Sequence, residues 1–336
     1  MTSSHPPTRI PERLVPVPTT LSEPAQAIIA MGNPLPFKPW PPLDDREAVQ
    51  AFIDERNAAA PPGAEGPMVA SCYGAADTGV PCATARIELD GVGVWQAIPD
   101  SLAADDRRVY LVIHGAWIYG GGELARLGAA MTAGGLGAKT WAVDYRMPPF
   151  HPFPTPLDDC LTAYRALLDA HRPEDIIIGG MSGGANLTVA TILRARDEGL
   201  PLPAAAVVNT PPIDLTKVGD SYQASQGVDI SYDEAELETV FKLYTDGHDR
   251  RDPYVSPLFG DFGKGFPPTI LTTGTRDFLL SDTVRLHRTL LAAGVEAELH
   301  VWEGAPHFMF LGLAPEDHQR QAQVRQFCER QWAAAR

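Results

Sequence analysis

Short apolar runs alternate with amphipathic segments over most of the chain. Six runs of five residues have the continuous apolar character of strands buried on both faces of a parallel sheet. They lie at 109–113, 140–144, 176–180, 205–209, 269–273 and 297–301. Segments with helical periodicity lie between most of them. Strand followed by helix, repeated along the chain, predicts an α/β fold with a mostly parallel, doubly wound sheet and helices on both faces.

Two further strands are expected before these runs. Residues 83–89 and 92–98 are joined by Asp90-Gly91, a pair that favours a two-residue hairpin turn. The sheet should therefore have about eight strands. The clearest helix is expected to begin after Thr155 as its cap, with Pro156 at the first helical position.

The N-terminal region does not follow the strand–helix rhythm. Prolines punctuate residues 1–43, which predicts an arm without regular structure. Asp44 or Asp45 then caps an expected helix that runs through about Arg56, and a loop rich in glycine and proline follows.

A second irregular region lies between residues 209 and 269. It has about sixty residues, whereas a simple crossover needs about a dozen. The segment 233–246 inside it has helical character, which indicates an inserted helical cap. We therefore expect an N-terminal arm with part of the cap at 1–80, the cap insertion at 211–255, and the sheet-containing core at 81–210 and 256–336.

Composition and charge exclude several classes of partner. The formal net charge of -15 argues against nucleic acid and against an anionic membrane surface. The four cysteines form no Cys-x-x-Cys pair, so no zinc site is indicated. Cys72 and Cys82 are close enough in sequence to be bridged, although free thiols in a reducing compartment are the simpler account. The proline-rich N-terminus has no apolar leader or span, which favours a cytoplasmic protein.

A candidate nucleophile follows the apolar run at 176–180. Gly180-Met181-Ser182-Gly183-Gly184 has the pattern G-x-S-x-G, whose outer glycines permit the tight turn that holds a serine hydroxyl clear of the backbone. A strand precedes the motif and a helix follows it, which is the context that the motif requires. Ser182 is therefore expected to act as a nucleophile.

A serine hydroxyl needs a base, and the base needs an acid to orient it. Asp277 follows the run at 269–273 and His307 follows the last run, in the chain order Ser, Asp, His of this fold class. An Asp after a strand can also be a helix cap, a role that Ser281 or Asp282 could fill instead. His300 falls within an expected strand, so His307 is the better candidate for the base.

Donors for a developing oxyanion are expected in the loop after 109–113. There the sequence His114-Gly115-Ala116-Trp117 leaves backbone N–H groups accessible, and Gly183 supplies another N–H directly after the nucleophile. We expect Gly115, Ala116 and Gly183 to form the oxyanion hole. The ring of His114 is expected to brace the loop rather than to contact a substrate.

Five stretches between about residue 109 and residue 310 resemble the hormone-sensitive-lipase-like esterases, the bacterial family IV branch of the α/β-hydrolases. They are HGAW at 114–117, DYRMPPFHPFP at 144–154, GMSGGANL at 180–187, SPLFGDF at 256–262 with TGTRD at 273–277, and EGAPHFMF at 303–310. The resemblance implies a triad of Ser182, Asp277 and His307. It also implies a cap built from the N-terminal segment and the insertion after the sixth strand of the core, and a homodimer.

The chain departs from the family pattern near the site. Ala116 and Trp117 stand where the family has glycines, and Met181 replaces the acid before the nucleophile. Phe150 replaces a second acid. As a hypothesis, Met181, Trp117 and Tyr119 shape the substrate pocket, with core packing as the alternative for Met181.

These observations predict a serine hydrolase that cleaves small carboxylic esters through an acyl-enzyme. The resemblance implies acyl chains of short to medium length, with aryl esters or lactones as alternative substrates. Neither a cofactor nor a metal is required for that chemistry. A non-catalytic small-molecule receptor of the same fold is the main alternative, although such receptors have lost the histidine that is present here. An amidase or an acyltransferase would use the same triad.

Overall fold

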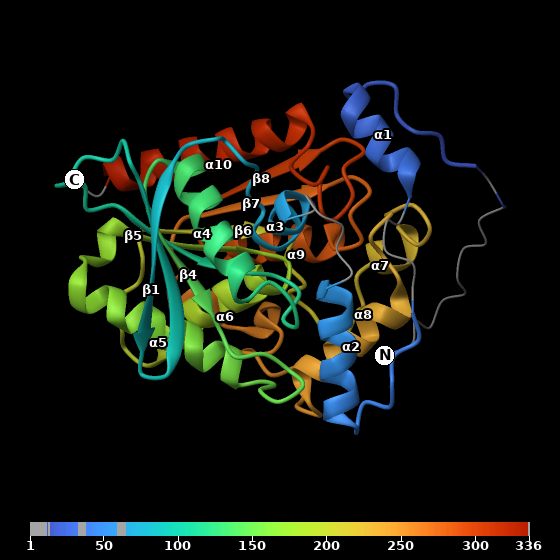
Figure 1. Ribbon diagram of the computed structural model, residues 1–336, viewed down its shortest axis with the longest axis horizontal. Helices are drawn as coiled ribbons and strands as arrows, with labels where there is room; N and C mark the ends of the chain where they lie inside the picture. The colour runs from blue at the N-terminus through green and yellow to red at the C-terminus, as the bar shows by residue number, and fades with distance from the viewer. Residues whose placement is uncertain (1–11, 13, 33–37, 59–64, 335–336) are drawn as a thin grey trace.

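One eight-stranded sheet forms the centre of the protein (Figure 1). The computed structural model describes residues 12, 14–32, 38–58 and 65–334. The strands follow the order β1-β2-β4-β3-β5-β6-β7-β8. Their bounds are β1 Cys82–Leu89, β2 Val92–Pro99, β3 Val109–Ile113, β4 Lys139–Asp144, β5 Ile176–Met181, β6 Ala205–Asn209, β7 Thr269–Gly274 and β8 Ala297–Trp302. The predicted α/β fold with a mostly parallel sheet is confirmed.

The antiparallel part of the sheet is confined to its first strands. β1 pairs with β2 and β2 pairs with β4 in antiparallel register, and every later pair is parallel. Asp90 and Gly91 join β1 to β2 with φ values of 49° and 84°. Both values are positive, as a two-residue hairpin turn of type I′ requires, and this confirms the predicted turn.

Helices cover both faces of the sheet because the buried strands are apolar on both sides. In β3, Val109, Leu111 and Ile113 join one core cluster, while Tyr110 and Val112 join the other. The first face carries α5 Thr155–Ala170, α6 Gly183–Asp197 and α9 Leu280–Ala292, and the second carries α3 Glu65–Tyr73, α4 Glu123–Leu136 and α10 Pro315–Ala334. Short 3-10 turns occur at Pro173–Asp175, Pro257–Phe259 and Phe262–Lys264. Among the described helices, none has both the length and the apolar character needed to cross a membrane.

Three local predictions are wrong. Helix α5 begins at Thr155 itself, and Pro154 is its cap, because the carbonyl of Pro154 already accepts the N–H of Asp158. The N-terminal arm contains the helix α1 Glu23–Met31, in which a proline occupies the first turn, where its missing N–H costs no hydrogen bond. The expected loop before β1 contains α3, whose buried residues pack in the core. All four cysteines are free, including Cys72 and Cys82.

The remaining helices gather at one end of the molecule (Figure 1). They are α1, α2 Arg46–Ala58, α7 Ser221–Ala224 and α8 Glu234–Thr245. Asp45, one of the two predicted caps, accepts the N–H of Ala48 at the start of α2. Glu236 joins the N-terminal segment to α8, since its carboxylate accepts from Trp40 Nε1 at 2.6 Å and from Arg56 Nη1 at 2.9 Å.

Helix α1 packs over the loop that follows β8, in a different apolar cluster from the one that contains α2. Ile28 and Ile29 share an apolar cluster with Ala305 and Phe310. The backbone N–H and the hydroxyl of Ser22, the cap of α1, both donate to the carboxylate of Glu316 at 2.8 Å. The N-terminal segment therefore contacts two separate parts of the protein.

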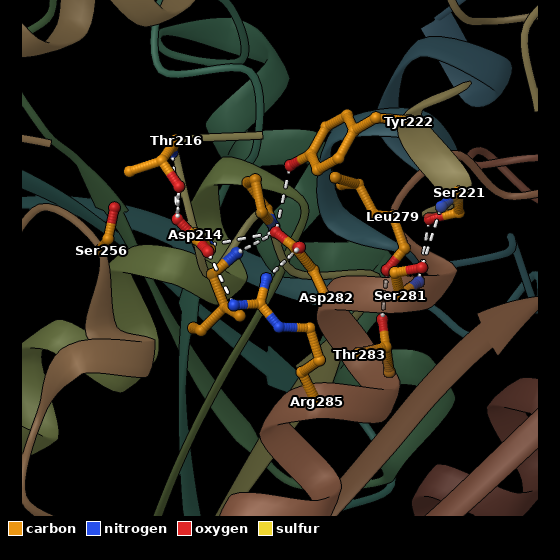
Figure 2. Close-up of polar contacts among 12 residues, drawn as sticks. Asp214, Thr216, Ser221, Tyr222, Ser256, Leu279, Ser281, Asp282, Thr283 and Arg285 are labelled. Carbon is orange, nitrogen blue, oxygen red and sulfur yellow. Dashed lines mark hydrogen bonds and ion pairs between the residues drawn. The ribbon is translucent and has the colours of Figure 1, made fainter. Parts of the chain in front are cut away.

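A charged cluster with two buried carboxylates ties the insertion to α9. Figure 2 shows Arg285 between two carboxylates, 2.8 Å from Asp214 and 3.6 Å from Asp282. Asp282 also accepts from the N–H groups of Ile213 and Asp214 and from the hydroxyl of Tyr222. Burial, together with the nearby charge of Asp214, raises the pKa of Asp282 to about 7.

Replacement of Asp282 by Asn should change how stability depends on pH. The pKa of Asp282 is about 7 in the folded protein against an ordinary value of 3.8, so its contribution to the free energy of unfolding falls as the pH rises between these values. The fall is at most about 1.4 kcal/mol per pH unit. Asp282→Asn lacks this dependence. Urea unfolding at about pH 5 and about pH 8 should show the variant gaining stability relative to wild type at the higher pH, and a difference that is equal at both pH values would contradict this.

Candidate active site

Ser182 lies in a tight turn between β5 and α6. Its backbone has φ 53° and ψ -123°, a conformation that a residue with a side chain rarely adopts. The flanking glycines are required by close backbone contacts. A β-carbon at Gly180 would lie 2.5 Å from the carbonyl of Gly184, and one at Gly184 would collide with the carbonyl oxygen of Ile113. The tight turn expected from the G-x-S-x-G pattern is thus present.

Polar side chains at the ends of neighbouring strands support this turn. The N–H of Ser182 donates to the carbonyl of Asn209 at 2.9 Å. The amide of Asn209 donates in turn to the carbonyl of Gly180 at 3.2 Å and accepts from the hydroxyl of Thr272 at 2.7 Å. Neither Asn209 nor Thr272 is among the residues predicted from the sequence, although an Asn at the end of an apolar strand is a signal of such a role.

The structure brings Ser182, His307 and Asp277 together from three separate loops. Ser182 Oγ lies 2.9 Å from His307 Nε2, and His307 Nδ1 lies 3.2 Å from Asp277 Oδ1. Asp277 also accepts from the hydroxyl of Thr273 at 2.7 Å and from the N–H of Leu279 at 2.8 Å. The side chains of Asp277 and His307 are both buried, so the hydrogen bonds that orient them are shielded from water.

The alternative residues lie elsewhere. Asp282 faces the insertion in the cluster of Figure 2. The hydroxyl of Ser281 accepts from the N–H of Ser221, also in the insertion. His300 lies on β8, 3.3 Å from Glu298. None of the three has a hydrogen bond or ion pair to Ser182 or His307 in the described part of the chain.

One predicted oxyanion donor is not available. The N–H of Gly115 donates to the carbonyl of Cys72 at 2.7 Å, so it is already paired, and the prediction for Gly115 is wrong. The next two residues have the left-handed backbone of a glycine-rich loop, with φ 64° at Ala116 and 56° at Trp117. No hydrogen bond between described residues uses either of their N–H groups. The N–H of Gly183 opens α6, where no preceding turn supplies a carbonyl.

His114 braces the loop that carries these N–H groups. Its ring stacks on Tyr145 with centroids 3.9 Å apart, and its Nδ1 lies 3.0 Å from the carbonyl of Gly115. Burial lowers the pKa of His114 to about 4, so the ring is neutral at physiological pH. The hydroxyl of Tyr145 donates to the carbonyl of His114 at 3.0 Å. These contacts agree with the expected bracing role.

The same loop is held at its far end. The hydroxyl of Tyr73, on α3, donates to the carbonyl of Gly120 at 2.7 Å. The carboxylate of Asp144, at the end of β4, accepts the N–H of Gly122 at 2.9 Å. Side chains from α3 and from the end of β4 therefore fix the far end of the loop 114–122.

The side chain of Trp117 is buried between the insertion and the nucleophile turn. Only 2% of it is exposed, and its ring stacks on Tyr244 of α8 with centroids 4.4 Å apart. A β-carbon at Gly183 would lie 2.7 Å from this ring. Trp117 thus holds the loop after β3 against the first residue of α6.

Met181 and Tyr119 have different surroundings. A β-carbon at Gly74 would lie 3.1 Å from the sulfur of Met181 and 3.0 Å from the guanidinium of Arg320. Met181 is buried beside α3 and α10. Its surroundings favour a role in core packing over a role in the substrate pocket. Tyr119 is half-buried, and its hydroxyl has no hydrogen-bond partner among the described residues. Burial raises the pKa of Tyr119 to about 12, so the hydroxyl keeps its proton.

In the described ranges, no group of three or more His, Cys, Asp or Glu side chains is placed to hold a metal ion. The chemical groups described above are the hydroxyl of Ser182, the imidazole of His307, the carboxylate of Asp277 and the N–H groups of the loop.

Comparisons with known proteins agree on the type of fold and of enzyme. The sequence model of a family described as the alpha/beta hydrolase fold matches residues 110–311. An acetyl-hydrolase of Streptomyces hygroscopicus is 35% identical over 202 residues, which are 60% of this chain and 67% of that protein. An esterase of Acinetobacter venetianus is 35% identical over 55% of this chain and 62% of its own length.

Solved structures give the same result over nearly the whole chain. A crystal structure of an esterase superposes with a TM-score of 0.81 and 33% identity, covering 96% of this chain and 98% of the other. A second is the crystal structure of an esterase from the bacterial hormone-sensitive lipase family. It has a TM-score of 0.75 and 29% identity over 93% of this chain and 99% of its own.

Replacement of Trp117 by Ala should lower both stability and turnover. Loss of a buried aromatic ring typically costs about 3–5 kcal/mol, and here it also frees the loop that carries the N–H groups of Ala116 and Trp117. Thermal unfolding and kcat for a chromogenic ester measure the two effects. The control Trp95→Ala truncates a half-buried tryptophan on β2 and should lower the melting temperature alone. Wild-type kcat in a folded Trp117→Ala variant would contradict this account of the loop.

Proposed function

We propose that this chain, which belongs to the hormone-sensitive-lipase-like esterases of the α/β-hydrolase family, hydrolyses small esters by a Ser-His-Asp mechanism with a covalent acyl-enzyme. The observation that carries the proposal is the continuous path of contacts from Ser182 Oγ to His307 Nε2 and from His307 Nδ1 to Asp277 Oδ1. A serine hydroxyl becomes a competent nucleophile only when such a base can take its proton.

In the acylation step, Ser182 Oγ attacks the ester carbonyl while His307 Nε2 takes the hydroxyl proton. Asp277 holds the imidazole by its Nδ1 and stabilises the positive charge that develops on the ring. Collapse of the tetrahedral intermediate breaks the bond between the carbonyl carbon and the alcohol oxygen. The proton on Nε2 passes to that oxygen, and the alcohol leaves.

The oxyanion of the tetrahedral intermediate needs donors that are already in place. We assign this role to the N–H groups of Ala116, Trp117 and Gly183. Ala116 and Trp117 are supported by their left-handed backbone and by N–H groups that make no hydrogen bond to any described residue, and Gly183 is supported by its place at the start of α6. The helix end adds a partial positive charge at the same point.

Deacylation repeats these steps with water as the nucleophile. His307 Nε2 takes a proton from the water, and the hydroxide attacks the acyl carbonyl. The bond to Ser182 Oγ then breaks, and the proton returns to that oxygen as the carboxylic acid is released.

Esters of short acyl chain are the proposed substrates. The support is the acetyl-hydrolase among the relatives, together with the bulk of Trp117, whose ring fills space beside Gly183. Tyr119 is the residue we assign to substrate binding, because it lies two residues after Trp117 in the loop 114–122 and its buried hydroxyl has no hydrogen-bond partner among the described residues. The receptor alternative is disfavoured, since His307 is present and lies within hydrogen-bond distance of Ser182.

Ser182→Ala tests the mechanism directly. Loss of a triad nucleophile costs several orders of magnitude in kcat, about 10⁶-fold where it has been measured. We expect the variant to keep the wild-type melting temperature, to lose hydrolysis of a chromogenic acetate ester, and to escape labelling by a phosphonate. Ser101→Ala changes an exposed serine and should behave as wild type. A tenth of wild-type kcat remaining in Ser182→Ala would rule out the mechanism.

Tyr119→Phe tests the proposed binding residue. Because the hydroxyl has no partner among the described residues, its removal should not lower the melting temperature. If it binds the ester, KM should rise about tenfold, the equivalent of one hydrogen bond, while kcat changes little. A KM series over acyl esters of increasing length measures this effect. An unchanged KM across the series would remove Tyr119 from the site.

A further inference from the structure

Asp229 connects the insertion to both loops that carry the acid and the base. It lies between α7 and α8, and only 2% of it is exposed. Its Oδ2 accepts the backbone N–H of Phe278 at 3.1 Å and that of His307 at 3.0 Å. Phe278 directly follows Asp277. A single oxygen atom of Asp229 therefore binds both the base, His307, and the residue next to the acid.

The other oxygen fixes the carboxylate in place. Asp229 Oδ1 accepts from the N–H of Ser231 at 2.9 Å and from its hydroxyl at 2.6 Å. The carboxylate thus receives four donors and has little freedom to rotate. Burial and the charge of Asp277 raise the pKa of Asp229, whereas these donors and His307 favour its charged form.

Aromatic rings reinforce the same connection. The ring of Tyr232, also in the insertion, stacks on Phe278 with centroids 4.5 Å apart. The ring of Phe278 in turn lies 4.7 Å from that of His307. Ser225 adds a contact of 3.4 Å from its hydroxyl to the carbonyl of Asp277. Residues 225–232 therefore contact the acid and the base from one side.

The loops after β7 and β8 also contact each other directly, since the N–H of Arg276 donates to the carbonyl of Ala305 at 3.1 Å and the N–H of Gly304 donates to the hydroxyl of Thr275 at 2.7 Å, but these bonds do not involve residues 277, 278 or 307. The direct contact between His307 Nδ1 and Asp277 Oδ1 is 3.2 Å, at the long end of the hydrogen-bond range. Without Asp229, the buried N–H groups of residues 278 and 307 would lose their acceptor, and both loops would shift to find another. A shift of about 1 Å between reacting groups can cost about 100-fold in rate.

We propose that Asp229 is a positioning residue for hydrolysis, which sets the geometry of the Asp277–His307 pair through the backbone of residues 278 and 307. The inference rests on the proposed function, because it assigns Asp229 to the same triad. In this proposal the insertion helps to position the catalytic residues, in addition to any role in covering the site.

Asp229→Ala and the near-isosteric Asp229→Asn test the proposal. Each is measured as kcat and KM for a chromogenic acetate ester, as the rate of inactivation by a phosphonate, and as the melting temperature. For Asp229→Ala we expect kcat and the inactivation rate to fall about 100-fold, with KM within about threefold of wild type. In Asp229→Asn the amide oxygen can still accept from the two N–H groups. The amide NH₂ group, however, then faces the N–H and the hydroxyl of Ser231, which are also donors. We expect a fall of about tenfold.

Asp214→Asn is the matched control. Asp214 is also a buried carboxylate of the insertion, and its Oδ1 makes the same local turn, accepting the N–H of Thr216 at 3.0 Å and its hydroxyl at 2.5 Å. Its second oxygen faces Arg285 instead of the triad loops. The control should lower the melting temperature and leave kcat per folded molecule within about threefold of wild type.

The outcomes separate this inference from the function on which it rests. Folded Asp229→Asn with wild-type kcat, or an equal loss of kcat in Asp214→Asn, would overturn the positioning role. If Asp229→Ala does not fold, the comparison of the two Asn variants still decides the question. Activity retained in Ser182→Ala would refute the triad itself. Activity lost in Ser182→Ala but kept in both Asp229 variants would refute only the inference.

Discussion

The active site depends on the close approach of two backbone turns, one after β3 and one after β5. No side chain separates them at Gly184, where a β-carbon would collide with the carbonyl of Ile113. This contact brings the N–H groups of residues 116 and 117 beside the turn that carries Ser182. Three residues with side chains, Ala116, Trp117 and Ser182, have positive φ here, a strain of about 1–3 kcal/mol each. Stacking of Trp117 on Tyr244 and the hydrogen bond from Ser182 to Asn209 offset that strain.

Much of the fold could be predicted because the central strands β3, β5, β6 and β7 are buried on both faces. A continuous apolar run has few alternatives in a chain of this composition, and each of the six expected runs lies in a strand whose bounds differ by at most one residue at either end. The positions of Ser182, Asp277 and His307 at the carboxyl ends of strands followed from the same rule. The local pattern of apolar residues therefore predicted both the sheet and the edge, at the carboxyl ends of the strands, where the site lies.

Features that depend on distant partners could not be predicted in this way. The N–H of Gly115 is paired with the carbonyl of Cys72, far upstream, and backbone acceptors leave no mark in the sequence. Asp229 resembles any other acid in a polar insertion, since its importance lies in two N–H groups that reach it only in the folded protein. The helices α1 and α3 were missed because prolines in a first turn resemble those of an irregular loop.

The two helices of the N-terminal segment contact different parts of the site, so sequence changes in each helix can affect the enzyme in a different way. Helix α1 packs on Ala305 and Phe310, which flank the base, whereas α2 packs near Ile118 at the oxyanion loop through the shared apolar cluster with Leu243. Under the proposed mechanism, changes in α1 act on the side of the imidazole, and changes in α2 act on the side assigned to the carbonyl oxygen. Substitutions in one N-terminal segment can therefore alter two different parts of the site, while the sheet stays the same.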